Sequence, residues 1–187
     1  MSTTPSTRAD YSLRRMTEAD IPAVSALENR LFPIDAWPLQ MFFDELSQPE
    51  TREYWVAEVP GEMTTAEPAS PQIIGYAGLM CIPPIADVQT IAVVPEQEGR
   101  GIGTALLKKL IDGAISGGAD DVLLEVREDN PRAQDLYVRH GFEHIHTRKK
   151  YYRDGVDARI MRLELGQQKL AQQRLTQPKD AQHETKN

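Results

Sequence analysis

Three glycines stand on alternate positions, Gly99, Gly101 and Gly103, in the stretch EGRGIGTALL, directly before an apolar helical pattern. Glycine adopts positive φ values and has no Cβ, so a glycine-rich turn can bring backbone N–H groups against a ligand. At the start of a helix these groups carry the positive end of the helix dipole and form an anion site. The turn therefore indicates a phosphate-binding loop. The alternative is a tight strand-to-helix turn without a ligand.

Three phosphate ligands compete for such a turn. A nucleoside triphosphate loop needs Lys followed by Ser or Thr after its last glycine, whereas Gly103 is followed by Thr104 and Ala105. A dinucleotide site needs the spacing G-x-G-x-x-G in a first strand–helix–strand unit, whereas this turn is spaced G-x-G-x-G and lies mid-chain. The spacing disfavours both. The third ligand, the pyrophosphate of coenzyme A, is implied only by the family resemblance described below.

Glu125 is the candidate general base. It lies in VLLEVR between apolar neighbours, where a buried carboxylate is costly unless it has a partner or a task. Partial burial makes a carboxylate a better proton acceptor near neutral pH. The alternative is a structural carboxylate, either paired with Arg127 on the same strand face or solvated at the strand end.

Tyr137 is the candidate general acid. It lies in NPRAQDLYVRHGF, where Asn130 as N-cap, Pro131 at the first position and Gly141 past the end predict a short helix. A phenol, with an ordinary pKa of about 10, is protonated at neutral pH. It can therefore donate a proton to a leaving group such as a thiolate. The place of Tyr137 on one helical face favours core packing instead, and the residues alone leave both interpretations open. His140 is interpreted as a helix-end histidine.

The cysteine and histidine content predicts neither a disulfide nor a metal site. Cys81 is the single cysteine and lies in the apolar run GLMCI, which is typical of a small core residue. One cysteine excludes an intramolecular disulfide and suits a reducing compartment. His144 and His146 share one face of a predicted strand, but no further ligand has suitable spacing, so we expect no metal.

Length and charge narrow the class of protein. The 187 residues suit one domain, and 40% hydrophobic with 26% charged residues is typical of a globular chain. A formal net charge of −7 disfavours direct nucleic-acid binding and suits a basic substrate. The start, MSTTPSTRADYSLRR, has no apolar leader segment, and no apolar run approaches the ~20 residues of a membrane span. We therefore expect a cytoplasmic protein without membrane contact.

The hydrophobic pattern predicts an α+β fold, a mixed but mostly antiparallel sheet flanked by helices, with the chain order β-α-α-β-β-β-α-β-α-β-β. Thr17 and Asp20 resemble a capping box at the start of the first helix. The expected strands cover residues 11–16, 52–59, 73–82, 87–94, 120–127, 142–152 and 157–165, and the expected helices cover 17–32, 38–48, 104–115 and 131–140.

Three regions follow from the composition along the chain. Residues 1–10 are polar and predict a loose N-terminus, and residues 11–165 form the domain. Residues 59–72 are rich in Pro, Ser, Thr and Glu, which indicates an exposed loop between strands. Residues 166–187 are polar and predict a disordered tail.

At this point the motifs resemble a known family. TIAVVP, EGRGIG, TALL, LLEVREDN and PRAQDLYVRHGF, in this order, resemble the GCN5-related N-acetyltransferase (GNAT) superfamily, and the order of elements is similar from Tyr11 to Leu165. A second set of stretches is similar to the ribosomal-protein alanine N-acetyltransferases of the RimI type: ALENRLFPIDAW, QTIAV, LEVREDN, LYVRHGF and RKKYYRDGVDARIMRLEL.

The resemblance implies roles for the residues above. Acetyl-CoA would be the cosubstrate, with no metal. Glu125 would accept the proton of the amine through water, and the Tyr137 hydroxyl would face the coenzyme sulfur. Asn130, besides capping its helix, would contact the coenzyme.

The resemblance also implies the coenzyme-binding backbone. The strand residues Ile91, Ala92 and Val93 would pair with the pantetheine arm, as in strand addition. The phosphate turn would comprise Gly99, Arg100, Gly101, Ile102, Gly103 and Thr104. One residue departs from the pattern: Glu98 stands where the family usually has Gln or Arg. An acidic group beside a pyrophosphate is unfavourable unless its side chain turns away or is offset by a cation.

The acceptor amine can be weighed by proton affinity. An α-amino group has a pKa of about 7.7–8.0 and lysine one of about 10.4, so a glutamate base copes more easily with a protein N-terminus. The RimI-type resemblance points to the N-terminal alanine of a ribosomal protein. Transfer to a lysine or a small amine, and a non-catalytic acyl-coenzyme-binding module, remain as alternatives.

We expect the acceptor peptide to enter between the first two helices and the final hairpin. Tyr151, Tyr152 and Asp154 are candidate wall residues, and Glu28 and Asp35 are candidate contacts to a basic peptide. The alternative for each of them is ordinary hairpin or surface composition.

Overall fold

The computed structural model describes residues 11–61 and 71–166. The predictions of a loose N-terminus and a disordered tail, and most of the predicted loop at 59–72, concern residues outside these ranges. Over the described chain the predicted order of strands and helices is confirmed, with two added 3-10 turns, η1 at Glu18–Asp20 and η2 at Pro95–Gln97.

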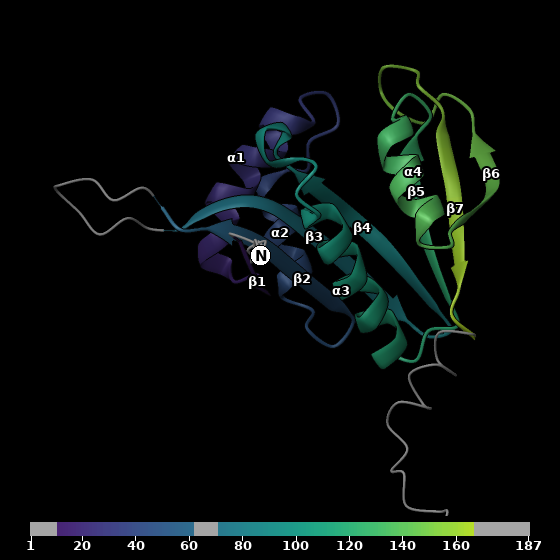
Figure 1. Cartoon of the computed structure of the whole chain (residues 1–187), viewed down its shortest axis with the longest axis horizontal. Coiled ribbons are helices and arrows are strands. Elements are labelled where there is room, and N and C mark those ends of the chain that lie inside the picture. Colours follow the sequence, from purple (N-terminus) through teal and green to yellow (C-terminus); the bar gives the residue numbers. More distant parts are fainter. Residues whose placement is uncertain (1–10, 62–70, 167–187) are drawn as a thin grey trace, which may run out of the picture.

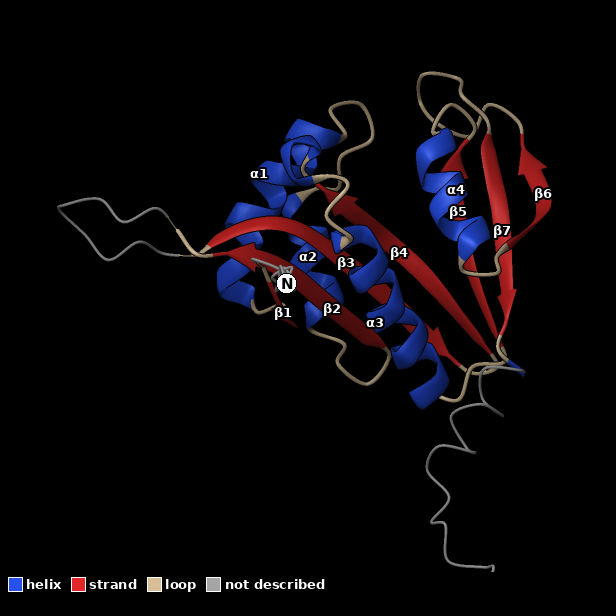
Figure 2. Ribbon diagram, in the orientation of Figure 1, coloured by secondary structure: helices blue, strands red, loops and turns tan. Residues whose placement is uncertain are grey.

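The strands and helices form one layered unit (Figures 1 and 2). The strands are β1 Ser12–Arg15, β2 Arg52–Val59, β3 Gln72–Ile82, β4 Ile85–Val93, β5 Asp121–Arg127, β6 Glu143–Arg148 and β7 Ala158–Glu164. The helices are α1 Ile21–Leu31, α2 Leu39–Leu46, α3 Ile102–Ser116 and α4 Pro131–Arg139. The sheet order is β1-β2-β3-β4-β5-β7-β6, antiparallel throughout except between β4 and β5.

The predicted capping box is present at the start of the first helical segment. The Asp20 carboxylate accepts hydrogen bonds from the Thr17 backbone N–H at 2.8 Å and from its hydroxyl at 2.9 Å. Two guanidinium nitrogens of Arg14 also bind this carboxylate, each at 2.7 Å. The box opens η1, and α1 continues directly from it at Ile21. The bidentate pair therefore ties β1 to the start of α1.

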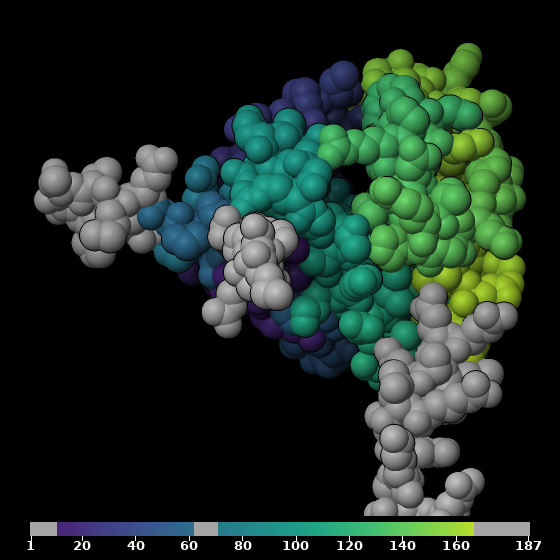
Figure 3. Space-filling model, viewed as in Figure 1, coloured from purple at the N-terminus to yellow at the C-terminus, as the bar shows by residue number. Residues whose placement is uncertain are grey.

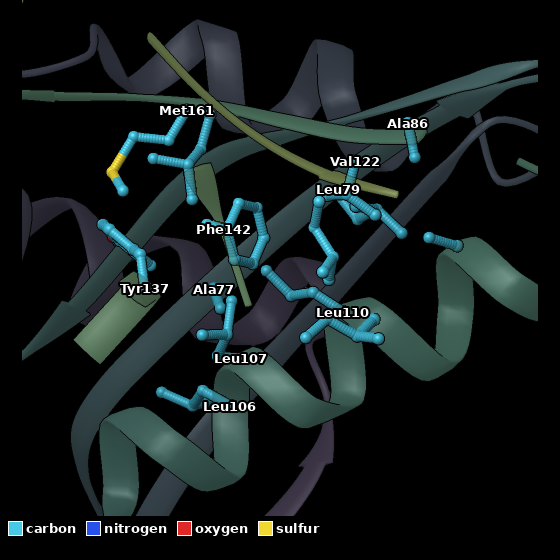
Figure 4. Packing of buried hydrophobic residues seen from close by; sticks show 14 of the residues in the cluster. Ala77, Leu79, Ala86, Leu106, Leu107, Leu110, Val122, Tyr137, Phe142 and Met161 are labelled. Carbon is cyan, nitrogen blue, oxygen red and sulfur yellow. The ribbon is translucent and has the colours of Figure 1, made fainter. Parts of the chain in front are cut away.

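The helices cover both faces of the sheet. α3 packs on β2, β3 and β4 with its predicted apolar face, and Leu106, Leu107 and Leu110 are fully buried beside Leu79 (Figure 4). α4 extends this cluster through Tyr137. α1 and α2 cover the other face around a second cluster of buried residues: Met16, Ile21, Val24, Phe42, Tyr54, Val56, Ile73, Tyr76 and Ala92. The sheet thus separates two apolar layers.

β4 and β5 form a fork. Their parallel pairing covers only Ile85–Val88 against Asp121–Leu124, and both strands run on beyond it. Figure 1 shows them diverging from the joined end toward α1 and α4. β4 stays paired with β3 through Val93, so beyond Val88 only the β4 edge that faces α4 has no partner strand. This edge is the structural feature that positions the site.

The final hairpin differs from the prediction. The strands predicted at 142–152 and 157–165 are shorter, and residues 149–157 form the connection. Lys150 has φ 52, a left-handed conformation that a strand cannot contain, and its N–H donates to Asp157 at 2.7 Å. β7 lies between β5 and β6 in the sheet. Within the described part of the chain, no helix has the length and apolar character needed to cross a membrane.

Candidate active site

A pocket of about 490 Å³ opens where β4 diverges from β5, between the β4 edge and α4. Its walls come from the end of α1, the β4 edge, the glycine turn and α4. Figure 3 shows the corresponding hollow between the teal and green parts of the chain. The size suits a small-molecule or cofactor site. Among the predicted coenzyme-binding residues, Arg100 alone is absent from the lining, and its guanidinium contacts Gln97 instead.

The glycine turn has the conformation that the sequence predicts. Gly99 and Gly101 have φ values of 78° and 80°, and Gly101 is the N-cap of α3. A Cβ at either position would meet no atom within 4 Å, so what glycine supplies here is the left-handed backbone rather than room. The first N–H groups of a helix lack intrahelical acceptors, and those of α3 begin in the pocket wall at Ile102. The turn therefore fits a phosphate group.

The β4 edge fits an extended ligand. Ile91, Ala92 and Val93 line the pocket, and they pair with β3 on their other side. Within the described sheet no strand pairs with the pocket-facing edge of residues 89–93. Unpaired backbone N–H and C=O groups need hydrogen-bond partners, so this edge can bind an amide-containing chain as an added strand would.

Asn130 and Arg132 form the start of α4 in the opposite wall. The Asn130 side chain caps the helix by accepting a hydrogen bond from the Ala133 N–H at 3.0 Å, as predicted. Arg132 forms an ion pair with Glu98 across the pocket mouth. The departure noted at Glu98 is therefore offset by a cation from another element. Sequence spacing carries no signal for this pair.

Tyr137 is both a core residue and a pocket residue. It is 4% exposed, packs against Phe142 with ring centroids 5.8 Å apart, and lines the pocket. Burial raises the pKa of the Tyr137 phenol above its ordinary value, and the charge of Tyr152 adds to this. The hydroxyl is therefore protonated at neutral pH. The two sequence interpretations, core packing and proton donation, do not exclude each other.

Glu125 lies where the two strands of the fork begin to diverge, one residue past the last β4–β5 pair. Its neighbours Leu124 and Val126 point into the core below α3, so Glu125 projects from the opposite face, and it does not line the pocket. Its side chain is 32% exposed and forms an ion pair with Arg148 of β6. Arg127, which the sequence suggested as a partner of Glu125, does not form this ion pair. The Tyr151 hydroxyl hydrogen-bonds to Glu125, which raises the pKa of Tyr151.

Arg127 instead contacts side chains of two loops that lie beside Glu125. It binds Asp154 at 2.6 Å and Asp35 at 3.5 Å, and its guanidinium lies 4.7 Å from the Tyr152 ring centre. Burial, followed by the charge of Glu125, raises the pKa of Tyr152 to about 12. The α1–α2 loop and the β6–β7 loop therefore meet here. Three of the predicted acceptor-side residues are brought together by an arginine that sequence reasoning did not select.

Glu28 does not match its prediction as a peptide contact. It is 3% exposed, and its carboxylate accepts hydrogen bonds from the Tyr76 hydroxyl and, at 3.1 Å, from the Trp37 N–H. Burial raises the pKa of Glu28. Glu28 therefore links the α1–α2 loop, through Trp37, to Tyr76 of β3. An isolated glutamate on a helix carries no signal that separates this role from a surface one.

Within residues 11–61 and 71–166, no histidine or cysteine lines the pocket. Among residues 11–61 and 71–166, no group of His, Cys, Asp and Glu side chains could hold a metal ion. His144 is hydrogen-bonded to Thr147 at 2.9 Å, and a bulge between His144 and His146 breaks the strand register.

Comparison with known proteins shows the family of the chain. The model of the acetyltransferase (GNAT) family matches residues 21–142. The chain is 40% identical over 157 residues to the N-alpha-acetyltransferase RimI of Mycobacterium tuberculosis, covering 81% of this chain and 90% of that protein. The ribosomal-protein-S18-alanine N-acetyltransferase of Escherichia coli has a similar structure, with a TM-score of 0.67 and 28% identity over 82% of this chain and 93% of that one.

The fold recurs in a solved complex with the expected cosubstrate. NAA60 of Arabidopsis thaliana in complex with acetyl-CoA has a TM-score of 0.71 and 17% identity, covering 83% of this chain and 98% of that one. The chain belongs to the GNAT family of acetyltransferases. Within that family it is an N-acetyltransferase, and its resemblance to the RimI type is confirmed.

Proposed function

We propose that this chain transfers the acetyl group of acetyl-CoA to the N-terminal α-amino group of a protein, namely the N-terminal alanine of a ribosomal protein in the cytoplasm. One observation carries the proposal: the fork between β4 and β5 has Tyr137 on its pocket side and Glu125 at its other face. A proton acceptor and a proton donor thus flank a single opening, as direct attack by an amine requires.

The coenzyme-binding groups are the pocket residues. The turn Gly99–Thr104 would hold phosphate, the edge Ile91–Val93 would pair with the pantetheine arm, and Asn130 would contact the arm from α4. Bound acetyl-CoA supplies a thioester whose carbonyl carbon is open to attack. Backbone N–H groups of the β4 edge are suited to stabilise the developing oxyanion, because they are fixed before the reaction.

The proton transfers would use two side chains. Glu125 accepts the proton that the amine loses on attack, directly or through a water, and Arg148 and Tyr151 hold its carboxylate at the fork. Tyr137 donates a proton to the departing thiolate sulfur, which its raised pKa permits because the phenol stays protonated until needed.

The acceptor side favours a basic N-terminal peptide. Asp35 and Asp154 lie at the junction of the two loops beside Glu125, about a quarter exposed. Together with Asp129 they share two guanidinium groups, Arg127 and Arg153, so the three carboxylates leave an excess of negative charge. An α-amino group, with its pKa of about 7.7–8.0, supplies more neutral amine at pH 7 than lysine does. The names of the RimI-type relatives support the same acceptor.

Release of coenzyme A from acetyl-CoA tests the proposal with three acceptors: a peptide beginning Ala-Arg, the same peptide N-terminally blocked with an internal lysine, and spermidine. We expect turnover with the free N-terminus only. Glu125→Gln and Tyr137→Phe should each lower kcat by about 10²-fold or more, the usual contribution of one proton-transfer group. Glu128→Gln is the matched control, because Glu128 is an exposed carboxylate paired with Arg159 outside the pocket.

Each other outcome has a definite meaning. Turnover confined to spermidine or to the blocked peptide would reject the α-amine acceptor. Unchanged kcat in Glu125→Gln or Tyr137→Phe would reject that residue's role. Binding of acetyl-CoA without turnover across a wider amine panel would favour a non-catalytic acyl-coenzyme-binding module.

A further inference from the structure

An ion pair spans the mouth of the pocket. Glu98 directly follows η2 beyond β4, and Arg132 lies in the first turn of α4, so the pair joins the two arms of the fork at its open end. Both residues line the pocket. In Figure 3 the green and teal parts of the chain touch above the hollow. At its closed end the fork is joined by the pairing of Ile85–Val88 with Asp121–Leu124.

The position of Glu98 conflicts with a phosphate in the turn. Its carboxylate adjoins the glycines whose backbone would bind that phosphate, and like charges at such a range repel. Arg132 removes the conflict only as long as it stays on Glu98. A phosphate group carries more negative charge than the Glu98 carboxylate and can accept two parallel hydrogen bonds from the Arg132 guanidinium.

The exposure of both side chains allows the Glu98–Arg132 pair to separate. Arg132 is 61% exposed and Glu98 35% exposed, and an ion pair in contact with solvent is held weakly. The long Arg132 side chain can therefore turn from Glu98 into the pocket that it already lines, while the Glu98 carboxylate turns to water.

We propose that Arg132 binds a phosphate of the coenzyme and that Glu98 is its exchange partner in the ligand-free chain, so that the Glu98–Arg132 pair sets the affinity for coenzyme A. The inference rests on the proposed coenzyme ligand and not on the identity of the acceptor. Glu98 competes with the phosphate for one cation, and its removal favours binding.

A neighbouring pair provides the matched control. Arg30 of α1 binds Glu96 of η2 at 3.1 Å, and the two side chains are 52% and 66% exposed. This pair also joins a helix to the segment after β4, but neither residue lines the pocket. Arg30→Gln should therefore leave the affinity for coenzyme A unchanged.

Calorimetric titration with coenzyme A, without any acceptor, measures the exchange in wild type, Glu98→Gln, Arg132→Gln and the double variant. We expect Arg132→Gln to weaken binding about tenfold, the effect of one charged hydrogen-bonding partner. Glu98→Gln should tighten binding by about threefold, as expected for an exposed competing pair. The double variant should bind at least about fivefold more weakly than Glu98→Gln, because the phosphate contact is lost in both backgrounds.

The double variant is the decisive measurement. If it binds as well as Glu98→Gln, Arg132 only neutralises Glu98 and touches no phosphate, and the proposal is wrong. Competition with 3′-dephospho-coenzyme A and with pantetheine assigns the contact. The Arg132→Gln loss should vanish with pantetheine, and its persistence with the dephospho form distinguishes the pyrophosphate from the 3′-phosphate.

Failure of the proposed function and failure of this inference give different experimental results. A wild-type chain that binds coenzyme A but acetylates no amine overturns the function and leaves the exchange measurable. A wild-type chain that does not bind coenzyme A overturns both. An equal loss of pantetheine affinity in Arg132→Gln would show a general disturbance of α4 and reject the proposal.

Discussion

The Glu125 carboxylate contacts two side chains that respond to its charge in opposite ways, the Arg148 guanidinium and the Tyr151 hydroxyl. The negative charge and the accepted hydrogen bond both stabilise the neutral phenol, which is why the pKa of Tyr151 is raised. The position of the Glu125 carboxylate at the fork is thus coupled to the ionisation of Tyr151, which is visible by absorbance.

Glu125→Gln should lower the pKa of Tyr151 toward its ordinary value, because the amide can still accept a hydrogen bond but no longer repels the phenolate. The tyrosinate absorbance of each protein is titrated against pH, and the Tyr151 contribution is isolated by difference from Tyr151→Phe. An unchanged Tyr151 titration in Glu125→Gln would show that the two side chains are apart in solution.

Asp20 makes a second residue-scale prediction. The hydrogen bonds from Arg14 lower the pKa of Asp20 from 3.8 to about 2. An acid whose folded pKa lies below its unfolded pKa contributes stability above the unfolded value, and loses it as the pH falls through the folded value. Asp20→Asn should lower the free energy of unfolding at pH 7 by about 1–2 kcal/mol, after allowance for the solvent around Arg14.

Urea unfolding of the wild type and Asp20→Asn between pH 7 and pH 2 checks this. The difference between them should be constant above about pH 5 and shrink as the pH falls toward about 2, because the unfolded chain begins to protonate Asp20 above its pKa of 3.8 and the folded chain only near pH 2. A difference that does not change with pH would assign the stability of this end of α1 to packing alone.

At the scale of elements, two glycines distinguish backbone conformation from close packing. Gly101 begins α3 with φ 80 and open space around it, whereas a Cβ at Gly78 of β3 would overlap the Tyr54 ring. That ring cannot give way easily, because the Tyr54 hydroxyl donates to Glu45 at 2.8 Å and the side chain is 2% exposed.

Gly101→Ala should therefore lower the free energy of unfolding by about 1–2 kcal/mol, the strain of a left-handed alanine. Gly78→Ala should lower it by about 1–3 kcal/mol through overpacking. Coenzyme A affinity separates them: only Gly101→Ala should weaken binding, because it alone displaces the phosphate turn. Equal affinity in the two variants would contradict that role for the turn.

At the scale of the whole molecule, the fork leaves a β4 edge for a ligand to complete. A ligand that binds only the folded chain stabilises it by about 2.7 kcal/mol at a hundredfold excess over its Kd. Coenzyme A should therefore raise the melting temperature. It should slow amide exchange at residues 89–93 and 99–104, while β2 on the far side of β3 stays unchanged. Slower exchange spread evenly over the sheet would argue against strand-like binding at this edge.

Much of the site could be predicted because its signals are local. The glycine turn before α3, the Asn130 cap with Pro131 and the Thr17–Asp20 box each act within a few residues. Such short-range geometry is determined by residue type and spacing, so the sequence alone located the glycine turn, the helix that carries Tyr137 and the strand that carries Glu125. The one local signal that misled was the hairpin, where Lys150 ends the strand early.

The tertiary structure decided which side chains meet. Arg148 rather than Arg127 pairs with Glu125, Arg132 pairs with Glu98, and Glu28 turns into the core beneath the α1–α2 loop. The first two contacts join residues 23 and 34 positions apart. They depend on the placement of β7 between β5 and β6, and on where the β4–β5 pairing stops. Pairing across such separations is set by the packing of the whole sheet, for which spacing in one sequence carries no signal.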